Sequence, residues 1–350
     1  MKSATWNRKA ILSKYEKSSR LLRPAATLAF DLALFAGGSA LTLLALSLAL
    51  KLLGLLIVTT AIVRLFLIGH DACHGAFFGN AKLNAFCGRI AFLPSMTAFS
   101  LWDYGHNVAH HGYNNLKGRD QVWTPYSKAE FDALPPLRQR LERLYRSGYG
   151  WGAYYLVEMW WKKLYFASRK EIGSSRREFK MDSVLVTVGA LLWIAVVSGV
   201  AHYTGQSVGL LVALAVVVPF LLWNGVIGFV VYVHHTHPQI AWFQNRHEWQ
   251  RCRAYLTSTA GVRFPFGIER LMHDIMEHHA HHLNPRISMF RLRAAEQFLR
   301  ERFPDLPHYR IDRRSYFDCV RRCKLYDYAD HAWLDFAGRV TARVTPVAVA

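Results

Sequence analysis

The chain has 350 residues, 52% of them hydrophobic and 14% aromatic, yet its formal net charge is +19. A soluble domain this apolar would need an unusually large core, whereas a membrane protein with basic cytoplasmic faces accounts for both facts. The five cysteines are odd in number and contain no C-x-x-C pair, so we expect reduced thiols facing a cytosol-like compartment and no disulfide framework.

Four long apolar stretches predict membrane-spanning helices, because a helix needs about 20 apolar residues to cross a bilayer core. The first two cover residues 25–50 and 52–69, and only Lys51 with its neighbours separates them. The third and fourth cover residues 183–203 and 208–233. The sequence therefore predicts one domain with an all-α fold, an integral membrane protein whose four spans form two hairpins.

The basic residues predict the orientation of these spans. Residues 1–24 carry seven Lys or Arg against one acidic residue, Glu16, whereas the turn between the third and fourth spans carries none. The positive-inside rule then places residues 1–24, 70–182 and 234–350 in the cytosol. We expect a multi-pass protein of a bacterial inner membrane, with both termini and a helical cap on the cytosolic side.

Three details within this outline allow two interpretations. Residues 86–102 are apolar but short and contain Pro94, which favours a re-entrant or interfacial helix over a fifth span. Residues 148–166 are rich in Tyr and Trp, which indicates either a helix on the membrane surface or an aromatic core helix. Arg64 lies inside the second span, and we expect it to snorkel to the cytosolic end rather than to act inside the membrane.

Twelve of the 17 histidines fall into four clusters, and nearly all of them lie just past the ends of the apolar runs. The clusters read H-D-A-C-H, H-N-V-A-H-H, H-H-T-H and H-H-A-H-H, and they comprise His70 and His74; His106, His110 and His111; His234, His235 and His237; and His278, His279, His281 and His282. Neutral imidazole is the commonest biological metal ligand, so the clusters predict a buried metal centre.

The spacing predicts how these histidines divide. Residues three or four apart on a helix share a face, whereas adjacent residues such as His110 and His111 diverge by about 100°. An adjacent pair can therefore serve two different metals. Nine well-placed histidines exceed what one tetrahedral zinc requires, so two metals in one histidine-rich shell are the economical interpretation.

At this point the chain resembles the membrane fatty acid desaturase and hydroxylase superfamily. The motifs H-x3-H, H-x3-H-H and H-x2-H-H follow the hairpins in the order typical of that superfamily. The stretch W-D-Y-G-H-N-V-A-H-H-G-Y-N-N-L-K-G-R-D-Q-V-W-T-P-Y and the segment V-Y-V-H-H-T-H-P are similar to bacterial and plastid acyl desaturases of the delta-12 type. The resemblance covers roughly residues 50–310.

The resemblance implies two irons held by eight or nine histidines. The ligands that it implies are His70, His74, His106, His110, His111, His278, His281 and His282, with His235 as the ninth. His234 stands where relatives often have Gln or Glu, so the choice between His234 and His235 stays open. His237 is a less favoured candidate ligand, and it is expected instead to orient a ligand. His279 is expected to point outward or to form a hydrogen bond.

Polar residues beside the boxes are candidates for orienting the ligand rings. They are Asp71, Asp103, Asn107, Asp120, Asp274 and Glu277. The remaining histidines have no matching spacing and are expected to be ordinary; they are His202, His247, His273, His308 and His331.

The implied reaction is an O2-dependent desaturation that places a cis double bond in an acyl chain. Hydroxylation, acetylenic bond formation and carotenoid oxidation on the same scaffold are alternatives. A metal transporter or sensor is a remote one, because transporter ligands should lie near the bilayer midplane and these lie beyond the helix ends.

The sequence contains no G-x-G-x-x-G loop after a strand pattern and no H-P-G-G haem motif, so electrons are expected from a separate carrier. The charge of +19 suits an acidic ferredoxin-like donor, anionic lipid headgroups or an acidic acyl carrier protein. The expected substrates are an acyl lipid, acyl-CoA or acyl carrier protein. Nucleic acid is a poor match, because the charges flank the spans and form no nucleic-acid-binding motif.

Overall fold

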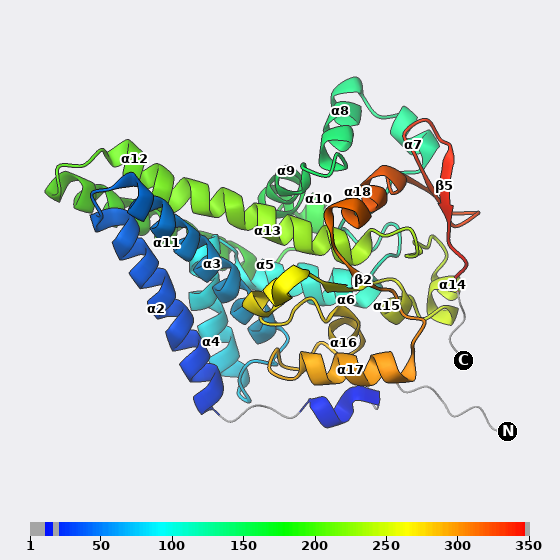
Figure 1. The fold of residues 1–350 in the computed structure, drawn as a ribbon, viewed down its shortest axis with the longest axis horizontal. Coiled ribbons are helices and arrows are strands. Elements are labelled where there is room, and N and C mark those ends of the chain that lie inside the picture. The colour runs from blue at the N-terminus through cyan, green and yellow to red at the C-terminus, as the bar shows by residue number, and fades with distance from the viewer. Residues whose placement is uncertain (1–10, 17–20, 347–350) are drawn as a thin grey trace. The chain divides into compact units, whose positions relative to one another are not determined.

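The computed structural model describes residues 11–16 and 21–346, and it is mostly helical (Figure 1). The chain divides into two compact units, each built from discontinuous segments. We call residues 19–105 and 152–229 the membrane unit, and residues 1–18, 106–151 and 230–350 the histidine unit.

The membrane unit contains the long apolar helices. Four helical runs of the described chain are long and apolar enough to cross a membrane, with mean hydropathies between 1.6 and 2.5. They are α2 (Leu22–Leu44), α3 (Leu48–Cys73), α11 (Arg177–Tyr203), and the continuous run of α12 (Val208–Val212), η5 (Ala213–Val217) and α13 (Val218–His235). The predicted number of spans is therefore confirmed.

The turn of the first hairpin lies earlier than predicted. Helix α2 ends at Leu44, and the hydroxyl of Ser47 caps α3 by accepting a hydrogen bond from the backbone N–H of Leu50. Lys51, expected to separate the helices, lies buried inside α3 instead. Its ammonium donates hydrogen bonds to the carbonyl oxygen of Thr42 at 3.1 Å and to Oε1 of Gln206 at 2.5 Å. The prediction was wrong because a charged side chain with buried polar partners does not end a helix.

The expectation that Arg64 snorkels was also wrong. The Nε atom of Arg64 lies 2.6 Å from Oδ1 of Asp31 on α2, and the Asp31 side chain is fully buried. An intramembrane charge is costly unless it is paired, and the ion pair between neighbouring helices supplies that partner.

The apolar segment 86–102 forms two short helices with a reversal between them. Helix α4 (Ala81–Phe92) and a 3₁₀ turn, η2 (Leu93–Ser95), lead to Met96, whose φ of 50° turns the chain toward α5 (Phe99–Asp103). Residues 86–102 therefore do not form a single straight span. This agrees with the sequence, which favoured a re-entrant or interfacial helix over a fifth span.

Two kinds of contact hold this reversal in the membrane unit. The carboxylate of Asp182 on α11 accepts hydrogen bonds from Nε of Arg89 at 2.7 Å and from the backbone N–H of Ser100 at 2.9 Å. A Cβ atom at Gly69 of α3 would lie 2.4 Å from the ring of Phe92, so only glycine admits this close packing.

The aromatic segment 148–166 forms α9 (Trp151–Tyr154) and a π-helix, η4 (Tyr155–Leu164), followed by α10 (Arg169–Ile172). One face of η4 packs on α13, with the Trp160 and Phe220 rings 4.8 Å apart. The adjacent Trp161 is 63% exposed. The segment thus contributes aromatic rings to the core of the membrane unit and leaves others at its surface.

The histidine unit is assembled from short helices. A π-helix, η3 (Tyr104–His110), leads into it. Its helices are η1 (Ser13–Tyr15), α6 (His111–Tyr113), α7 (Lys128–Asp132), α8 (Pro136–Tyr145), α14 (Arg246–Arg251), α15 (Ala254–Thr257), η6 (Pro265–Met272), α16 (His278–Leu283), α17 (Leu292–Arg302) and α18 (Arg313–Arg322).

Five short strands in the histidine unit were not predicted. Strand β1 (Gly261–Arg263) pairs in parallel with β2 (His308–Arg310). Strands β3 (Leu325–Asp327), β4 (Ala332–Leu334) and β5 (Val340–Arg343) form an antiparallel sheet. Each strand has three or four residues, too few for a period of two to be recognised in the sequence.

Candidate metal centre

Four histidines of the histidine unit converge on one point. They are His110 at the end of η3, His235 at the end of α13, and His278 and His282 on α16. All four are buried, and each offers a ring nitrogen within 4.8 Å of the others. The Nε2 atoms of His278 and His282 lie 3.2 Å apart. We call these four residues the first histidine group.

Hydrogen bonds orient three of these rings. The Nδ1 of His110 lies 3.1 Å from Oδ1 of Asp120, and the Nδ1 of His235 lies 3.0 Å from Oδ1 of Asn115. The Nδ1 of His278 lies 3.2 Å from the carbonyl oxygen of Ile275. Because each Nδ1–H donates to an oxygen, the Nε2 atom of each ring keeps its lone pair for a metal.

Asp120 is itself held in place by the backbone. Its Oδ2 accepts a hydrogen bond from the N–H of Asn115 at 2.8 Å, and its Oδ1 accepts one from Val122 at 3.1 Å. The carboxylate thus sets the direction of the His110 ring from within a fixed turn. One turn therefore supplies both Asp120 and Asn115, which orient two different ligands.

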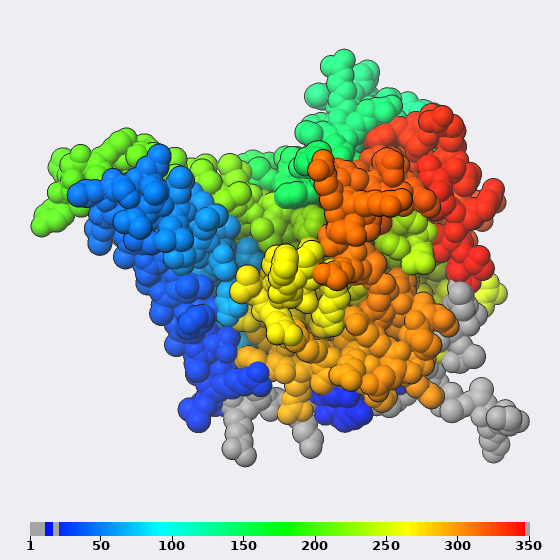
Figure 2. Space-filling view, viewed as in Figure 1, coloured from blue at the N-terminus to red at the C-terminus, as the bar shows by residue number. Residues whose placement is uncertain are grey.

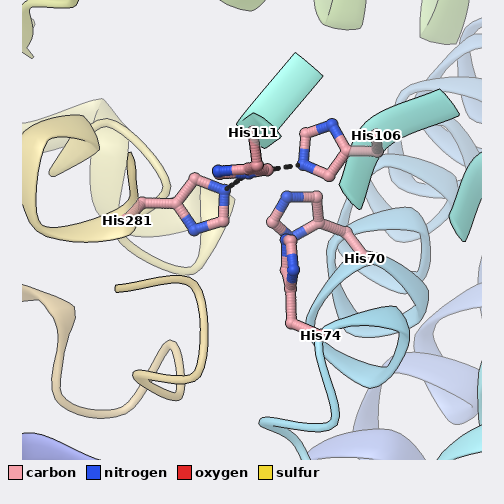
Figure 3. A group of neighbouring side chains, drawn as sticks. All are labelled: His70, His74, His106, His111 and His281. Atoms are coloured by element: carbon pink, nitrogen blue, oxygen red, sulfur yellow. Dashed lines mark hydrogen bonds between the residues drawn. The ribbon is translucent and has the colours of Figure 1, made fainter. Parts of the chain in front are cut away.

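A second histidine group contains His106, His111 and His281 (Figure 3). The Nε2 of His111 lies 3.0 Å from the Nε2 of His106 and 3.0 Å from the Nε2 of His281. His111 and His281 are buried, and His106 is half-buried. As the spacing predicts, the adjacent pair His110 and His111 divides between the two groups, and so does the pair of His281 and His282.

The first box, His70 and His74, belongs to the membrane unit. His70 lies in the last turn of α3 and His74 caps that helix, which brings their ring centroids to 4.7 Å. Both side chains are drawn in Figure 3. The i, i+4 spacing thus places the two imidazoles at one end of α3, as predicted.

The structure separates His235 from His234 and His237. His234 is buried and stacks on His278 with a centroid distance of 3.7 Å, but it is not a member of either group. His237 stacks on Tyr309 at 4.4 Å and accepts a hydrogen bond from the backbone N–H of Gln239. Burial lowers the pKa of His237 to about 4, so its imidazole is neutral at physiological pH.

One member of the first group, His282, has the protonation state that metal binding requires. Burial, followed by the neighbouring imidazoles of His278 and His110, lowers the pKa of His282 well below its ordinary value. A metal-ligating histidine must be a neutral imidazole, so the lowered pKa of His282 favours binding of a cation over binding of a proton.

One nitrogen of His235 indicates that the first histidine group suits a metal ion. Its Nε2 is buried and has no hydrogen-bond partner within the described chain, although its Nδ1 is bonded to Asn115. A buried polar atom without a partner is costly, and a metal ion among these imidazoles would satisfy it. Imidazole-rich shells suit iron, zinc and copper.

A third cluster, His279, Glu296 and His308, lies beside the ligand helix. The sequence indicated only that His279 would point outward or form a hydrogen bond, and the hydrogen bond is what the structure shows. The Oε1 of Glu296 on α17 lies 2.7 Å from Nδ1 of His279 and 2.8 Å from Nε2 of His308, and its Oε2 accepts the backbone N–H of Ala280 at 2.8 Å. Burial alone would raise the pKa of Glu296, but His279 and His308 outweigh it and lower that pKa. His308, expected to be ordinary, therefore helps to anchor α16. No local spacing relates it to His279.

The other polar candidates from the sequence have mixed outcomes. Asp120 orients a histidine of the first group, as expected. Asp274 instead forms an ion pair with Arg293 at 2.5 Å, and Oε1 of Glu277 lies 2.5 Å from Nη1 of Arg263. Burial and the nearby Glu296 carboxylate nevertheless raise the pKa of Glu277 to about 7. The orienting role of Asn115 was not predicted.

The fold and the site together define a four-span helical membrane protein with a histidine-rich candidate metal centre. A model of the fatty acid desaturase family matches residues 46–314, and the chain belongs to that family.

Individual relatives agree with this assignment. The chain is 32% identical to an omega-6 fatty acid desaturase of Brassica napus chloroplasts, over 69% of the chain and 52% of the relative. It is 29% identical to the chloroplast omega-6 enzyme of Spinacia oleracea, over 83% of the chain and 62% of that relative. It is 28% identical to an sn-1 oleoyl-lipid 12-desaturase of a Picosynechococcus species, over 79% of the chain and 77% of the relative. The chain thus spans little more than half the length of the plastid relatives.

Proposed function

We propose that this protein is an O2-dependent di-iron acyl desaturase that introduces a cis double bond into a fatty acyl chain. One iron would be held by the first histidine group, and the second by His106, His111 and His281. The observation that carries the proposal is the division of adjacent histidines into two groups whose ring nitrogens converge. His70 and His74 are assigned to the iron shell on the sequence pattern of the family.

Bound iron would supply the oxidising power, using O2 and two external electrons, to remove hydrogens from an unactivated methylene. No acidic or basic side chain can perform that removal. The residues of this chain have other tasks. Asp120 and Asn115 orient the rings of His110 and His235, and burial excludes water from the first group. The lowered pKa of His282 keeps a proton off that ring.

The relatives guide the choice of substrate. Those compared above are described as omega-6 or oleoyl-lipid 12-desaturases, which supports a delta-12 type reaction on an acyl lipid for this chain. An acyl-CoA or acyl carrier protein thioester is the alternative carrier. The basic charge of +19 supports an acidic ferredoxin-like electron donor. The seven Lys or Arg of residues 1–24 support a cytosolic N-terminus and cytosolic histidine clusters in a bacterial inner membrane.

Hydroxylation or acetylenic bond formation remains the second function to test, because the same scaffold carries out all three oxidations. The choice between these oxidations depends on how the methylene group of the acyl substrate is positioned beside the metal. No residue in the histidine groups distinguishes them.

The test is the fatty acid profile of a bacterial host that expresses the chain with a ferredoxin, measured by gas chromatography–mass spectrometry. His110→Ala removes a first-group histidine, and His247→Ala changes a histidine outside every group. A new double bond in the wild type and His247→Ala, but not in His110→Ala, supports desaturation, and fragmentation locates the bond. A hydroxylated or acetylenic product favours the second function, and a purified chain that binds only zinc contradicts both.

A further inference from the structure

One segment of the histidine unit has apolar side chains outside and an acidic side chain inside. This segment is η6, which precedes the ligand helix α16 in the chain. Phe266 is 100% exposed, Leu271 is 55% exposed and Ile268 is 49% exposed. Glu269, between them, is buried. A surface helix facing water has the opposite arrangement.

The buried side of the segment is anchored by polar contacts. The Oε2 of Glu269 accepts a hydrogen bond from the backbone N–H of Phe264 at 3.2 Å, and its Oε1 lies 3.7 Å from Nη1 of Arg263. Arg263 belongs to strand β1. The inward side of the segment is therefore fixed to β1, and the apolar side chains are left pointing outward.

The backbone of the segment is kinked near its start. Phe266 has φ of 61° and Gly267 has φ of 70°, so two consecutive residues adopt the left-handed region. The left-handed region is unfavourable for a bulky residue such as phenylalanine. The backbone of Phe266 is therefore strained, and its ring lies at the surface. In Figure 2 the yellow part of the chain that includes this segment lies at the surface.

Among the described residues of the histidine unit, other exposed apolar side chains lie farther apart in the chain, such as Leu137 and Leu144, seven residues apart on α8. Leu137, for example, is 67% exposed but lies on α8, whose sequence P-L-R-Q-R-L-E-R-L-Y is strongly charged. Single exposed apolar residues are ordinary, whereas contiguous exposed apolar patches mark protein or membrane contact sites. Phe266, Ile268 and Leu271 are exposed within six residues of one another.

We propose that the segment Pro265–Met272 is a lipid-contacting surface that inserts Phe266, Ile268 and Leu271 into the headgroup and upper acyl layer of the membrane. The chain is a membrane protein, so a bilayer is always present as a partner. The exposed Arg270 supplies charge complementary to anionic headgroups. The segment ends six residues before His278, so it would tether the ligand helix to the layer in which acyl lipids reside.

The test measures the environment of residue 266 directly. Phe266→Cys and Leu137→Cys are made in a background whose five native cysteines are replaced, and each is labelled with an environment-sensitive NBD fluorophore. The full chain is reconstituted into phosphatidylcholine–phosphatidylglycerol vesicles, with and without doxyl-labelled phosphatidylcholine as quencher. Variants are compared only when their thermal unfolding matches that of the background.

We expect blue-shifted emission at position 266 and at least twofold stronger quenching by the doxyl lipid than at position 137. Equal quenching at the two positions overturns the proposal. Blue-shifted emission without lipid quenching, lost on dilution of protein in lipid, would assign the patch to a second copy of the chain and also overturn it. Arg270→Glu should weaken the quenching at 266 on anionic vesicles. None of these readouts requires activity, so this proposal and the proposed function can fail separately.

Discussion

The Nδ1 atom of His235 lies 3.0 Å from Oδ1 of Asn115, a residue 120 positions earlier in the chain. Asn115 belongs to no histidine cluster, yet it determines which nitrogen of His235 is available to a metal. Its φ of 57° places it in the left-handed region, which asparagine tolerates better than most residues. The position thus suits asparagine for its backbone conformation and for its amide oxygen.

Replacing Asn115 should therefore weaken metal binding. Asn115→Gly suits the left-handed backbone and removes the amide that orients His235. Loss of such an orienting contact typically lowers metal affinity about 10- to 100-fold. The measurement is iron retained per chain during titration with a chelator. Asn114→Ala is the matched control, because the side-chain NH2 group of each asparagine donates to a backbone carbonyl, at 3.0 Å for Asn114 and 3.2 Å for Asn115. Only Asn115 also contacts a histidine. Equal iron loss in the two variants would show that the Asn115 contact is only structural.

The two neighbouring histidines at the end of α13 should differ in their effect on metal content. His235→Ala removes a member of the first histidine group, so we expect about half of the bound iron to be lost. His234→Ala should retain both irons, because the His234 ring stacks on His278 and offers no nitrogen to either histidine group. Elemental analysis of purified protein gives the stoichiometry. The opposite pattern would exchange the roles of His234 and His235.

The carboxylate of Glu296 should stabilise the ligand helix through its three hydrogen bonds. In Glu296→Gln, one carboxylate oxygen becomes an NH2 group that faces N–H donors, so at least one bond is lost. Hydrogen bonds to a charged group contribute about 1.5–3 kcal/mol each, and we expect the free energy of unfolding to fall by about 2 kcal/mol or more. Iron content should fall with it. Glu301→Gln, an exposed position on the same helix, is the control for thermal unfolding in detergent. A Glu296→Gln protein as stable as that control would contradict the role.

Removing one partner of the Asp31–Arg64 ion pair should destabilise the protein more than removing both partners. Breaking a buried pair leaves an uncompensated charge and typically costs about 3–5 kcal/mol. Arg64→Leu or Asp31→Leu alone should therefore lower stability strongly, and the double variant should recover most of the loss. Thermal unfolding of the four proteins in detergent completes a double-mutant cycle. Additive effects would mean that the two charges do not interact.

The thiol of Cys319 should be almost unreactive in the folded protein. Burial raises its pKa from 9.0 to about 12. At pH 8 the reactive thiolate would be about 1,000-fold rarer than in the unfolded chain, and its fraction should rise tenfold for each pH unit up to the raised pKa. A variant with Cys319 as its single cysteine is labelled with iodoacetamide in mild detergent and in SDS. Folded and unfolded rates within tenfold of each other would show that the thiol is accessible.

The apolar runs and the histidine spacing, both local patterns, predicted much of the fold and of the candidate site. Four apolar runs of sufficient length were recognisable without a structure, because a helix must satisfy its own backbone across a bilayer. The i, i+4 spacing likewise predicted that His70 would lie beside His74, and the adjacent pair at 110 and 111 predicted a division between two groups. The ends of the helices were less predictable, since Ser47 caps α3 and Lys51 finds buried partners within reach.

By itself, the sequence determined the residue types and the short-range geometry of the site, because neighbours on one helix turn are fixed by the helical repeat. Only the tertiary structure decided which distant residues serve that site. Asn115 with His235, Glu296 with His279 and His308, and Asp31 with Arg64 meet through chain folding over 12 to 120 positions, and no periodicity records such pairings. The tertiary structure also decided that Phe266 is exposed and Glu269 buried, because that depends on which side of the segment packs on β1.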